Sequence, residues 1–303
     1  MLTALPSPRD EAWRYSDLKA LARVADWQAP VAGGHLTLDD GARVTQSADA
    51  QRQARRIVVP AGASATLIEA FAAPGDWCDL AVDIMLEPGA RLLHVVPQSR
   101  AGVTTAAFTV SVAAQALYEC VALNIGGDFS RLAFAVTLDG AQAQAHLYAG
   151  QLGRSAQTLE IVSRVDHKVP DCLSRQTVRT VLAERATGNT LSKTYVAQDA
   201  QGTDGAQSLK AMLLARTATA NAKPELEIYA DDVKCAHGAT VGELDKAALF
   251  YLASRGLTPE AARALLLQAF LADILAPLPE GALRDLLQAP VDGWMATALG
   301  GKA

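Results

Sequence analysis

The sequence predicts a mainly β protein built as a parallel β-helix, and three observations support this fold class. Between about residues 36 and 230, short runs rich in Val, Leu, Thr and Ala alternate with Gly-Ala or Gly-Asp turns. Gly-Ala pairs at positions 41, 62, 89 and 140 are separated by 21, 27 and 51 residues. The segment that begins at Gly75-Asp76-Trp77 is similar to the one that begins at Gly127-Asp128-Phe129, 52 residues later. Such a repeat is typical of a solenoid whose coils stack strand on strand.

An antiparallel β-sandwich would also contain many short strands. However, it gives no reason for a 52-residue offset between similar segments. Hairpin signals such as Asn-Gly or Asp-Gly flanked by alternating residues are also scarce, since only Asp40-Gly41 and Asp139-Gly140 qualify. We therefore favour the β-helix and expect it to span residues 36–243.

Residues 1–35 are expected to form a short N-terminal helical cap. Ser16 can act as the N-cap of a helix in which Leu18, Leu21 and Val24 are spaced three apart. The Gly33-Gly34 pair is expected to close this segment.

Residues 244–303 are expected to form a C-terminal helical domain. Gly256 is a typical stop for a first helix, and Thr258-Pro259 supplies an N-cap and a proline at the first position of a second. That second helix is expected to end before Pro277, and a short helix over Gly281–Leu287 to follow. The first helix is indicated by apolar residues at helical spacing: Leu244, Ala248, Leu249 and Leu252.

Charge and composition argue against a nucleic-acid partner. The formal net charge is −5, which repels a polyanion unless a basic stripe compensates. The densest basic cluster is Arg52, Arg55 and Arg56, and we interpret it as a solvated face. Aromatic residues make up only 5% of the chain, which is low for a protein that stacks on bases or sugars.

No membrane or export segment is predicted, so a cytoplasmic location is expected. The N-terminal residues lack the pattern of a secretory signal. The most apolar stretch, Ala261–Leu278, carries Arg263, Gln268 and Asp273 around the helix and leaves no clean lipid face. The four cysteines form no CxxC pair, and reduced thiols are expected.

Cys235 and His237 are the candidate metal ligands. They are two residues apart, so on an extended chain both side chains point to the same face. Thiolate and imidazole together suit zinc or iron–sulfur chemistry. Two ligands do not complete a tetrahedral site, so the remaining ligands would come from elsewhere in the chain or from a second subunit. The alternative is a partly buried cysteine beside a hydrogen-bonded histidine.

Other candidate residues favour structural roles. Asp166-His167 is interpreted as a polar pair at the surface or core edge, because no nucleophile elbow accompanies it. His94 and His146 occupy nearly corresponding places in the two repeats and are expected to be wall positions of the solenoid. No P-loop or GxGxxG pattern occurs, so an ATP-driven process would need another subunit as its ATPase.

The residues around the candidate pair also resemble a known family. The run from Lys223 to Gly242, KPELEIYADDVKCAHGATVG, is similar to the signature of SufD members of the SufB/SufD family. Leu249–Gly256, LFYLASRG, matches the LFYLxSRG of that family, and Glu11–Tyr15, Ser174–Gln176 and Gln201–Asp204 also fit. SufB members typically carry a glutamate-containing segment where this chain has His237–Thr240. The chain is shorter than many SufD proteins, and we expect a reduced N-terminal region.

The resemblance implies a right-handed parallel β-helix that acts as a non-enzymatic scaffold in iron–sulfur cluster assembly. It implies pairing with SufB through the β-helix and docking of the SufC ATPase by residues from about 244 onward. A transient iron–sulfur cluster would form at the SufB interface, with His237 and Cys235 as candidate ligands. A homodimer in the absence of SufB, and a flavin bound to the complex, are left open.

The runner-up function is a β-helix polysaccharide lyase or hydrolase. Such an enzyme needs clustered carboxylates or a basic proton abstractor in a groove, usually with aromatic platforms for the sugar. The low aromatic content and the absence of an export signal favour the scaffold instead.

Overall fold

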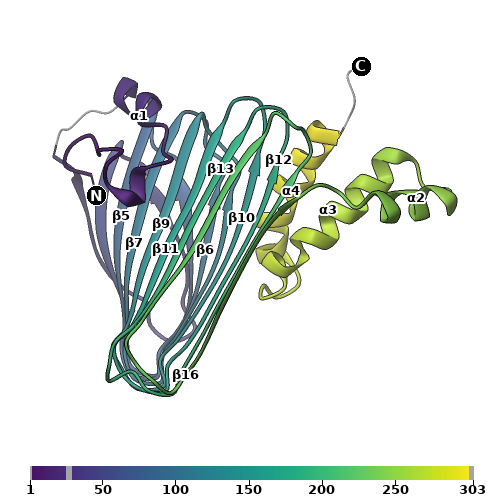
Figure 1. Ribbon diagram of the computed structural model, residues 1–303. Helices are drawn as coiled ribbons and strands as arrows, with labels where there is room; N and C mark the ends of the chain where they lie inside the picture. Colours follow the sequence, from purple (N-terminus) through teal and green to yellow (C-terminus); the bar gives the residue numbers. More distant parts are fainter. Residues whose placement is uncertain (1, 25–28, 300–303) are drawn as a thin grey trace.

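The computed structural model describes residues 2–24 and 29–299 and confirms the parallel β-helix (Figure 1). Successive strands alternate between two sheets, each of eight strands, and every strand pair in both sheets is parallel. The odd-numbered sheet comprises β1 (Val31–Thr37), β3 (Arg52–Val59), β5 (Trp77–Leu86), β7 (Val103–Val112), β9 (Phe129–Leu138), β11 (Thr158–His167), β13 (Thr187–Val196) and β15 (Thr219–Ile228). The even-numbered sheet comprises β2 (Arg43–Ala48), β4 (Ser64–Phe71), β6 (Arg91–Gln98), β8 (Leu117–Asn124), β10 (Gln144–Gly153), β12 (Leu173–Leu182), β14 (Thr203–Leu213) and β16 (Val233–Gly242).

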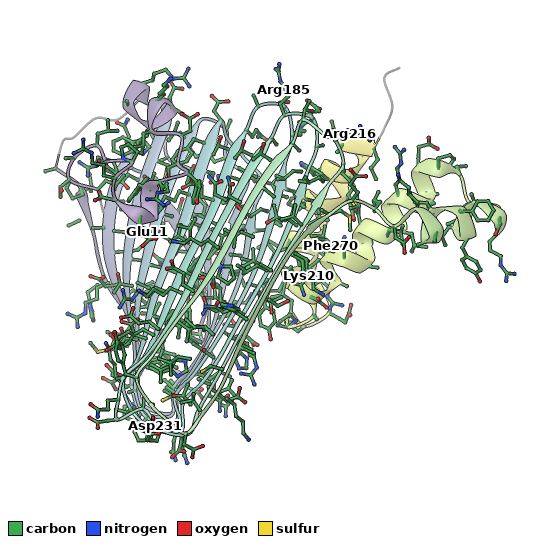
Figure 2. The ribbon with its side chains drawn as sticks, viewed as in Figure 1. Glu11, Arg185, Lys210, Arg216, Asp231 and Phe270 are labelled. Atoms are coloured by element: carbon green, nitrogen blue, oxygen red, sulfur yellow. The ribbon has the colours of Figure 1, made fainter. Side chains whose placement is uncertain are left out.

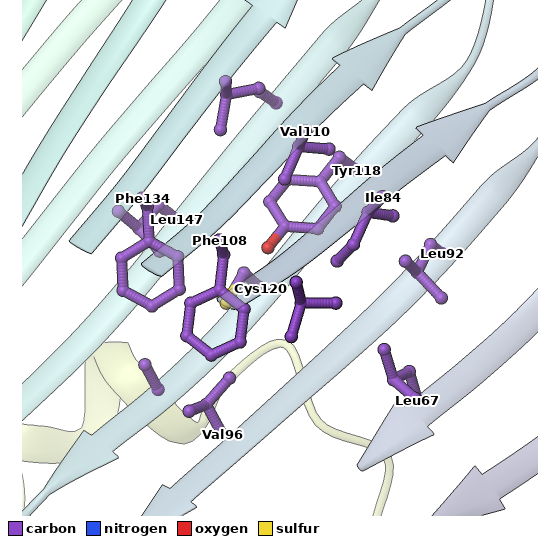
Figure 3. Packing of buried hydrophobic residues seen from close by; sticks show 14 of the residues in the cluster. Leu67, Ile84, Leu92, Val96, Phe108, Val110, Tyr118, Cys120, Phe134 and Leu147 are labelled. Atoms are coloured by element: carbon purple, nitrogen blue, oxygen red, sulfur yellow. The ribbon is translucent and has the colours of Figure 1, made fainter. Parts of the chain in front are cut away.

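The space between the two sheets, here called the lumen, holds the main core. Side chains alternate between the lumen and the outer face because the strand period is two. In the earlier coils the lumen is filled by aliphatic and aromatic side chains (Figure 3). Phe108 of β7 stacks on Phe134 of β9 with ring centroids 5.1 Å apart. In the later coils Gln, Ser and Thr replace many of these apolar side chains in the lumen.

The turns that join odd to even strands stack at the narrow edge of the solenoid, where Asp231 lies (Figure 2). All of these turns except the last, between β15 and β16, contain a residue with positive φ, such as Gly62 and Gly89 in the early turns and Gln115 and Gln142 in later ones. Gly140 is therefore not the counterpart of Gly89, although both precede alanine. Glycine is needed at 140 because a Cβ there would lie 1.9 Å from the backbone nitrogen of Ala114.

The prediction that the basic cluster forms a solvated face is wrong for two of its three members. Arg56 is exposed, whereas Arg52 and Arg55 are only 7% and 6% exposed. Arg55 points into the lumen, where it donates to Glu69 at 2.8 Å. Burial raises the pKa of Glu69 to about 7, and Arg55 acts in the opposite direction. Neighbouring positions on one strand thus face opposite sides, so a basic run is not a basic surface.

Residues 2–24 lie across the outer face of the odd sheet as a strap, with η1 (Glu11–Trp13) and α1 (Leu18–Val24). The strap covers one polar row that runs along the sheet in register. The Trp13 ring stacks on the guanidinium of Arg131, with Arg131 Cζ 3.8 Å from the ring centroid. The Ser16 hydroxyl donates to Glu160 at 2.8 Å instead of capping the helix, and Asp17 accepts from the Ala20 N–H, so the predicted Ser16 cap is wrong. The row consists of Arg52, Asp79, Thr105, Arg131, Glu160, Asn189 and Asn221.

Three C-terminal helices follow the last strand: α2 (Lys246–Ser254), α3 (Pro259–Leu275) and α4 (Ala282–Leu299). Helices α3 and α4 pack on the outer face of the even sheet, and Arg179 of β12 pairs with Asp273 of α3 at 2.6 Å. The predicted Thr258 cap and the Pro259 start are confirmed. The predicted short helix over Gly281–Leu287 is wrong.

Helix α4 continues through Pro290, because its apolar face extends along its whole length. Leu283, Leu287, Val291 and Trp294 are all buried in the cluster between the helices and the sheet. Tertiary packing of this face outweighs the hydrogen bond that proline cannot make. No helix in the described part of the chain is long and apolar enough to cross a membrane.

Candidate metal site at the open end of the solenoid

The last coil of the solenoid has a free edge on each strand. Strand β15 pairs with β13 and β16 pairs with β14, and within the described residues neither has a neighbour on its other side. Both strands are ten residues long, and most residues of β16 are exposed. Because no further coil covers it, the lumen is open at this end. We call this surface the open end.

Cys235 and His237 both lie in β16 and share the lumen-facing side. Cys235 is in register with Gly205 of β14 and His237 with Gln207, both of which belong to the buried alternation of β14. Paired residues of neighbouring parallel strands face the same side of a sheet. The predicted shared face is therefore present, with Cys235 half-buried and His237 exposed.

The thiol of Cys235 sits in a space left by glycine. A Cβ at position 205 would lie 3.4 Å from the Cys235 Sγ and 3.6 Å from the Ser174 Oγ. Burial raises the pKa of Cys235 and Asp204 adds to the rise, while the Gly205 N–H acts in the opposite direction. The thiol is therefore protonated at neutral pH, and binding a metal there would release a proton.

Among the described residues, the two candidate ligands have no third ligand beside them. No group of three or more His, Cys, Asp or Glu side chains in the described ranges is arranged to hold a metal ion. A thiol and an imidazole alone leave half of a tetrahedral shell unfilled.

Asp166 and His167 are not brought together, because they occupy opposite faces of β11. Asp166 faces outward and binds Arg164 at 2.7 Å. His167 is buried in the lumen, where its Nε2 lies 2.8 Å from the Ser174 hydroxyl. Burial lowers the pKa of His167 to about 4.

His94 and His146 both lie in strands, as expected, but they also face opposite sides. His94 is enclosed in the lumen, with its Nδ1 2.8 Å from the Tyr118 hydroxyl, and burial lowers its pKa to about 3. His146 is in register with Glu119 and lies on the outer face, with its Nδ1 3.8 Å from a carboxylate oxygen of Glu119.

Two features of this region were missed by sequence reasoning. Gln207 is the lumen-facing register partner of His237, although 30 residues separate them in the chain, and no local pattern signals this pairing. Helix α2 has no buried residue and exposes Phe250 and Tyr251 at 77% and 56%. The run LFYL, Leu249–Leu252, places four large apolar residues within about one turn of helix. Because they cannot all face the core, this run could have indicated the exposed aromatic side chains.

Comparison with known proteins places the chain in a family. A family model described as "SUF system FeS cluster assembly, SufBD core domain" matches residues 42–270. The chain belongs to the SufBD family. The match begins just before β2 and ends within α3, so it contains almost the whole solenoid and the candidate pair.

Individual SufBD relatives agree with this placement. The Escherichia coli iron–sulfur cluster assembly protein SufD is 37% identical over 127 residues, which cover 42% of this chain and 30% of that protein. Protein ABCI7, chloroplastic, of Arabidopsis thaliana is 29% identical over 245 residues, which cover 78% of this chain and 51% of that protein. A SufBD family protein of Synechocystis is also 29% identical, with 54% of its length covered. The chain thus spans about half the length of the last two relatives.

Proposed function

We propose that this protein is a scaffold subunit for iron–sulfur cluster assembly whose open end pairs with a SufB-type β-helix subunit. The observation that carries the proposal is the position of Cys235 and His237 on the uncovered lumen face of the last coil. A partner solenoid that covered this face would bring its own ligands to the same place. The nascent cluster is then cargo held between two chains rather than a resident cofactor of one.

The two ends of the solenoid differ in a way that supports pairing through β16. At the other end, β1 is interrupted by an irregularity between Ala32 and His35, around Gly33-Gly34. Bulges and glycines weaken an edge strand as a template for another chain. Strand β16 pairs with β14 over ten consecutive residues without a shift in register. Its free edge is therefore the more regular surface for a second chain.

The chemistry of the pair fits a shared cluster site. Iron–sulfur clusters are held by thiolates, and imidazole replaces thiolate in some of them. Burial raises the pKa of the Cys235 thiol, so iron binding there would displace a proton.

The C-terminal helices are proposed to dock the SufC-type ATPase. Helix α2 extends away from the solenoid (Figure 1), none of its residues is buried, and Phe250 and Tyr251 are exposed. Exposed aromatic side chains on a projecting helix are typical anchors for a protein partner.

The cluster site is tested by replacing His237 with Ala. We expect the His237→Ala variant to fold and to join the complex, because the imidazole is exposed. We expect the yield of cluster in the reconstituted complex to fall at least about tenfold, since loss even of an outer-shell partner costs that much. The measurement is iron and sulfide content with the visible absorption of the cluster. His35→Ala, which removes an exposed histidine at the opposite end, is the matched control, and a normal yield from His237→Ala would rule out the assignment.

The docking surface is tested by Phe250→Ser. Phe250 would be buried only by the partner, so its loss is expected to weaken binding of the ATPase subunit by about 10- to 100-fold. Isothermal titration calorimetry against the purified ATPase subunit measures the effect. The control is Tyr15→Ser, which removes a 40% exposed aromatic from the strap. Equal affinities for the two variants would place docking elsewhere.

A further inference from the structure

The lumen of the last coils contains a hydrogen-bonded row of amide and hydroxyl side chains. The hydroxyls of Ser163 and Ser192 donate to Gln176 Oε1 at 2.6 and 2.7 Å. Gln176 Nε2 donates to Thr194 Oγ1 at 2.9 Å. Gln207 Nε2 donates to the same oxygen, also at 2.9 Å. The row therefore ends on β14, one strand away from His237.

The orientation of the Gln207 amide is determined by its neighbours. Its Nε2 lies 3.3 Å from the backbone carbonyl oxygen of Glu225, and a carbonyl can only accept. The nitrogen must therefore face Glu225 and Thr194, and Oε1 points elsewhere. Gln207 is 3% exposed, and its Oε1 is a buried acceptor with no hydrogen-bond partner within the described chain.

Of the two cross-strand neighbours of Gln207, only one has a donor to offer. Gln176 on β12 uses both amide hydrogens, toward Thr194 and the Lys193 carbonyl oxygen. His237 on β16 is the other neighbour, and a neutral imidazole carries one N–H. The structure shows no hydrogen bond between them, but adjacent strands are about 4.8 Å apart, so rotation of the exposed His237 side chain toward β14 would bring a ring N–H to Gln207 Oε1.

We propose that Gln207 positions His237: its Oε1 accepts a hydrogen bond from one ring N–H and leaves the lone pair of the other ring nitrogen free for a metal. This bond satisfies a buried acceptor that otherwise bears the full cost of desolvation. It also fixes the ring tautomer and orientation, as outer-shell partners of metal-binding histidines do. The proposed hydrogen bond does not depend on the function proposed above, whereas its use in holding iron does.

The test is ¹⁵N NMR of the imidazole nitrogens in the free chain, with the His237 signals assigned by their loss in His237→Ala. In the wild type we expect one tautomer to dominate, beyond the ratio found for free imidazole in water. In Gln207→Met, which keeps the side-chain length but removes the acceptor, we expect the ratio to return to that of free imidazole. In the complex, the same variant is expected to lower cluster yield about tenfold.

Gln151→Met is the matched control. Gln151 is a lumen glutamine whose Nε2 also donates to threonine hydroxyls and a carbonyl and whose Oε1 also has no partner, but it lies on β10, away from His237. The Gln151→Met variant loses the same kinds of hydrogen bond in the lumen and should leave the His237 tautomer unchanged. A solvent-like tautomer ratio in the wild type would overturn the proposal even if Gln207→Met failed to fold. An unchanged ratio in folded Gln207→Met would overturn it as well. Cluster yield of His237→Ala reports separately on the proposed function.

Discussion

Val241→Lys is expected to abolish pairing of this protein with a SufB-type subunit. Val241 lies in the lumen-facing row of β16 and is 50% exposed because no coil follows. A partner that covers the open end would bury the lysine without a counter-charge, at a cost of about 3–5 kcal/mol. We therefore expect the Kd to rise by roughly 100- to 4,000-fold, measured by calorimetry or by co-elution in size-exclusion chromatography.

The matched control for this prediction is Val31→Lys. Val31 is 57% exposed on β1, at the other end of the solenoid. Both substitutions add one exposed charge, so both should leave the free energy of unfolding within about 0.5 kcal/mol of the wild type. Wild-type affinity of Val241→Lys, or equal weakening by both variants, would contradict pairing through the open end. The same variants, run without a partner subunit, report whether the chain pairs with itself through that surface.

The second large effect expected is a loss of stability in acid, caused by the lumen histidines. Burial lowers the pKa of His94 to about 3 and that of His167 to about 4, whereas the ordinary value is 6.5. Below pH 6.5 the unfolded chain binds two protons that the folded chain does not, so these histidines stabilise the fold above pH 6.5 and lose that contribution as the pH falls. Glu69 acts in the opposite sense, because its pKa is raised from 4.5 to about 7.

For these three lumen groups the net difference between about pH 4.5 and 6.5 is one proton, since two histidines oppose one carboxyl group. The free energy of unfolding should then fall by about 1.4 kcal/mol for each pH unit of acidification. Glu69→Gln should roughly double this slope, and His167→Gln should bring it close to zero. Urea unfolding at several pH values measures all three slopes. Three equal slopes would show that these lumen groups do not control the acid transition.

Local patterns were sufficient to predict much of the fold. The 52-residue similarity indicated a solenoid, and Thr258, Pro259 and Gly256 marked helix ends that the structure confirms. These features depend on the chain within a few residues, through capping, a fixed proline φ and a left-handed glycine. The end of α4 was predicted wrongly because burial of its apolar face, a tertiary effect, outweighs the proline within it.

The residues that lie beside one another in adjacent coils could not be predicted from the sequence. The number of residues per coil varies, and each change in that number shifts the register of the next strand. Arg55 pairs with Glu69 inside the lumen while Arg56, one residue on, is exposed, and only the register of β3 decides which is which. Stacking Trp13 on Arg131 likewise joins residues more than a hundred positions apart.

For the candidate site, the sequence by itself determined that Cys235 and His237 share one face, because side chains two apart on a strand always do. Only the tertiary structure decided that this face belongs to the last, uncovered coil and that Gln207 lies beside His237. The physical reason is that strand alternation is a property of the local backbone. Which strand lies alongside, and whether any does, depends on the stacking of the whole solenoid.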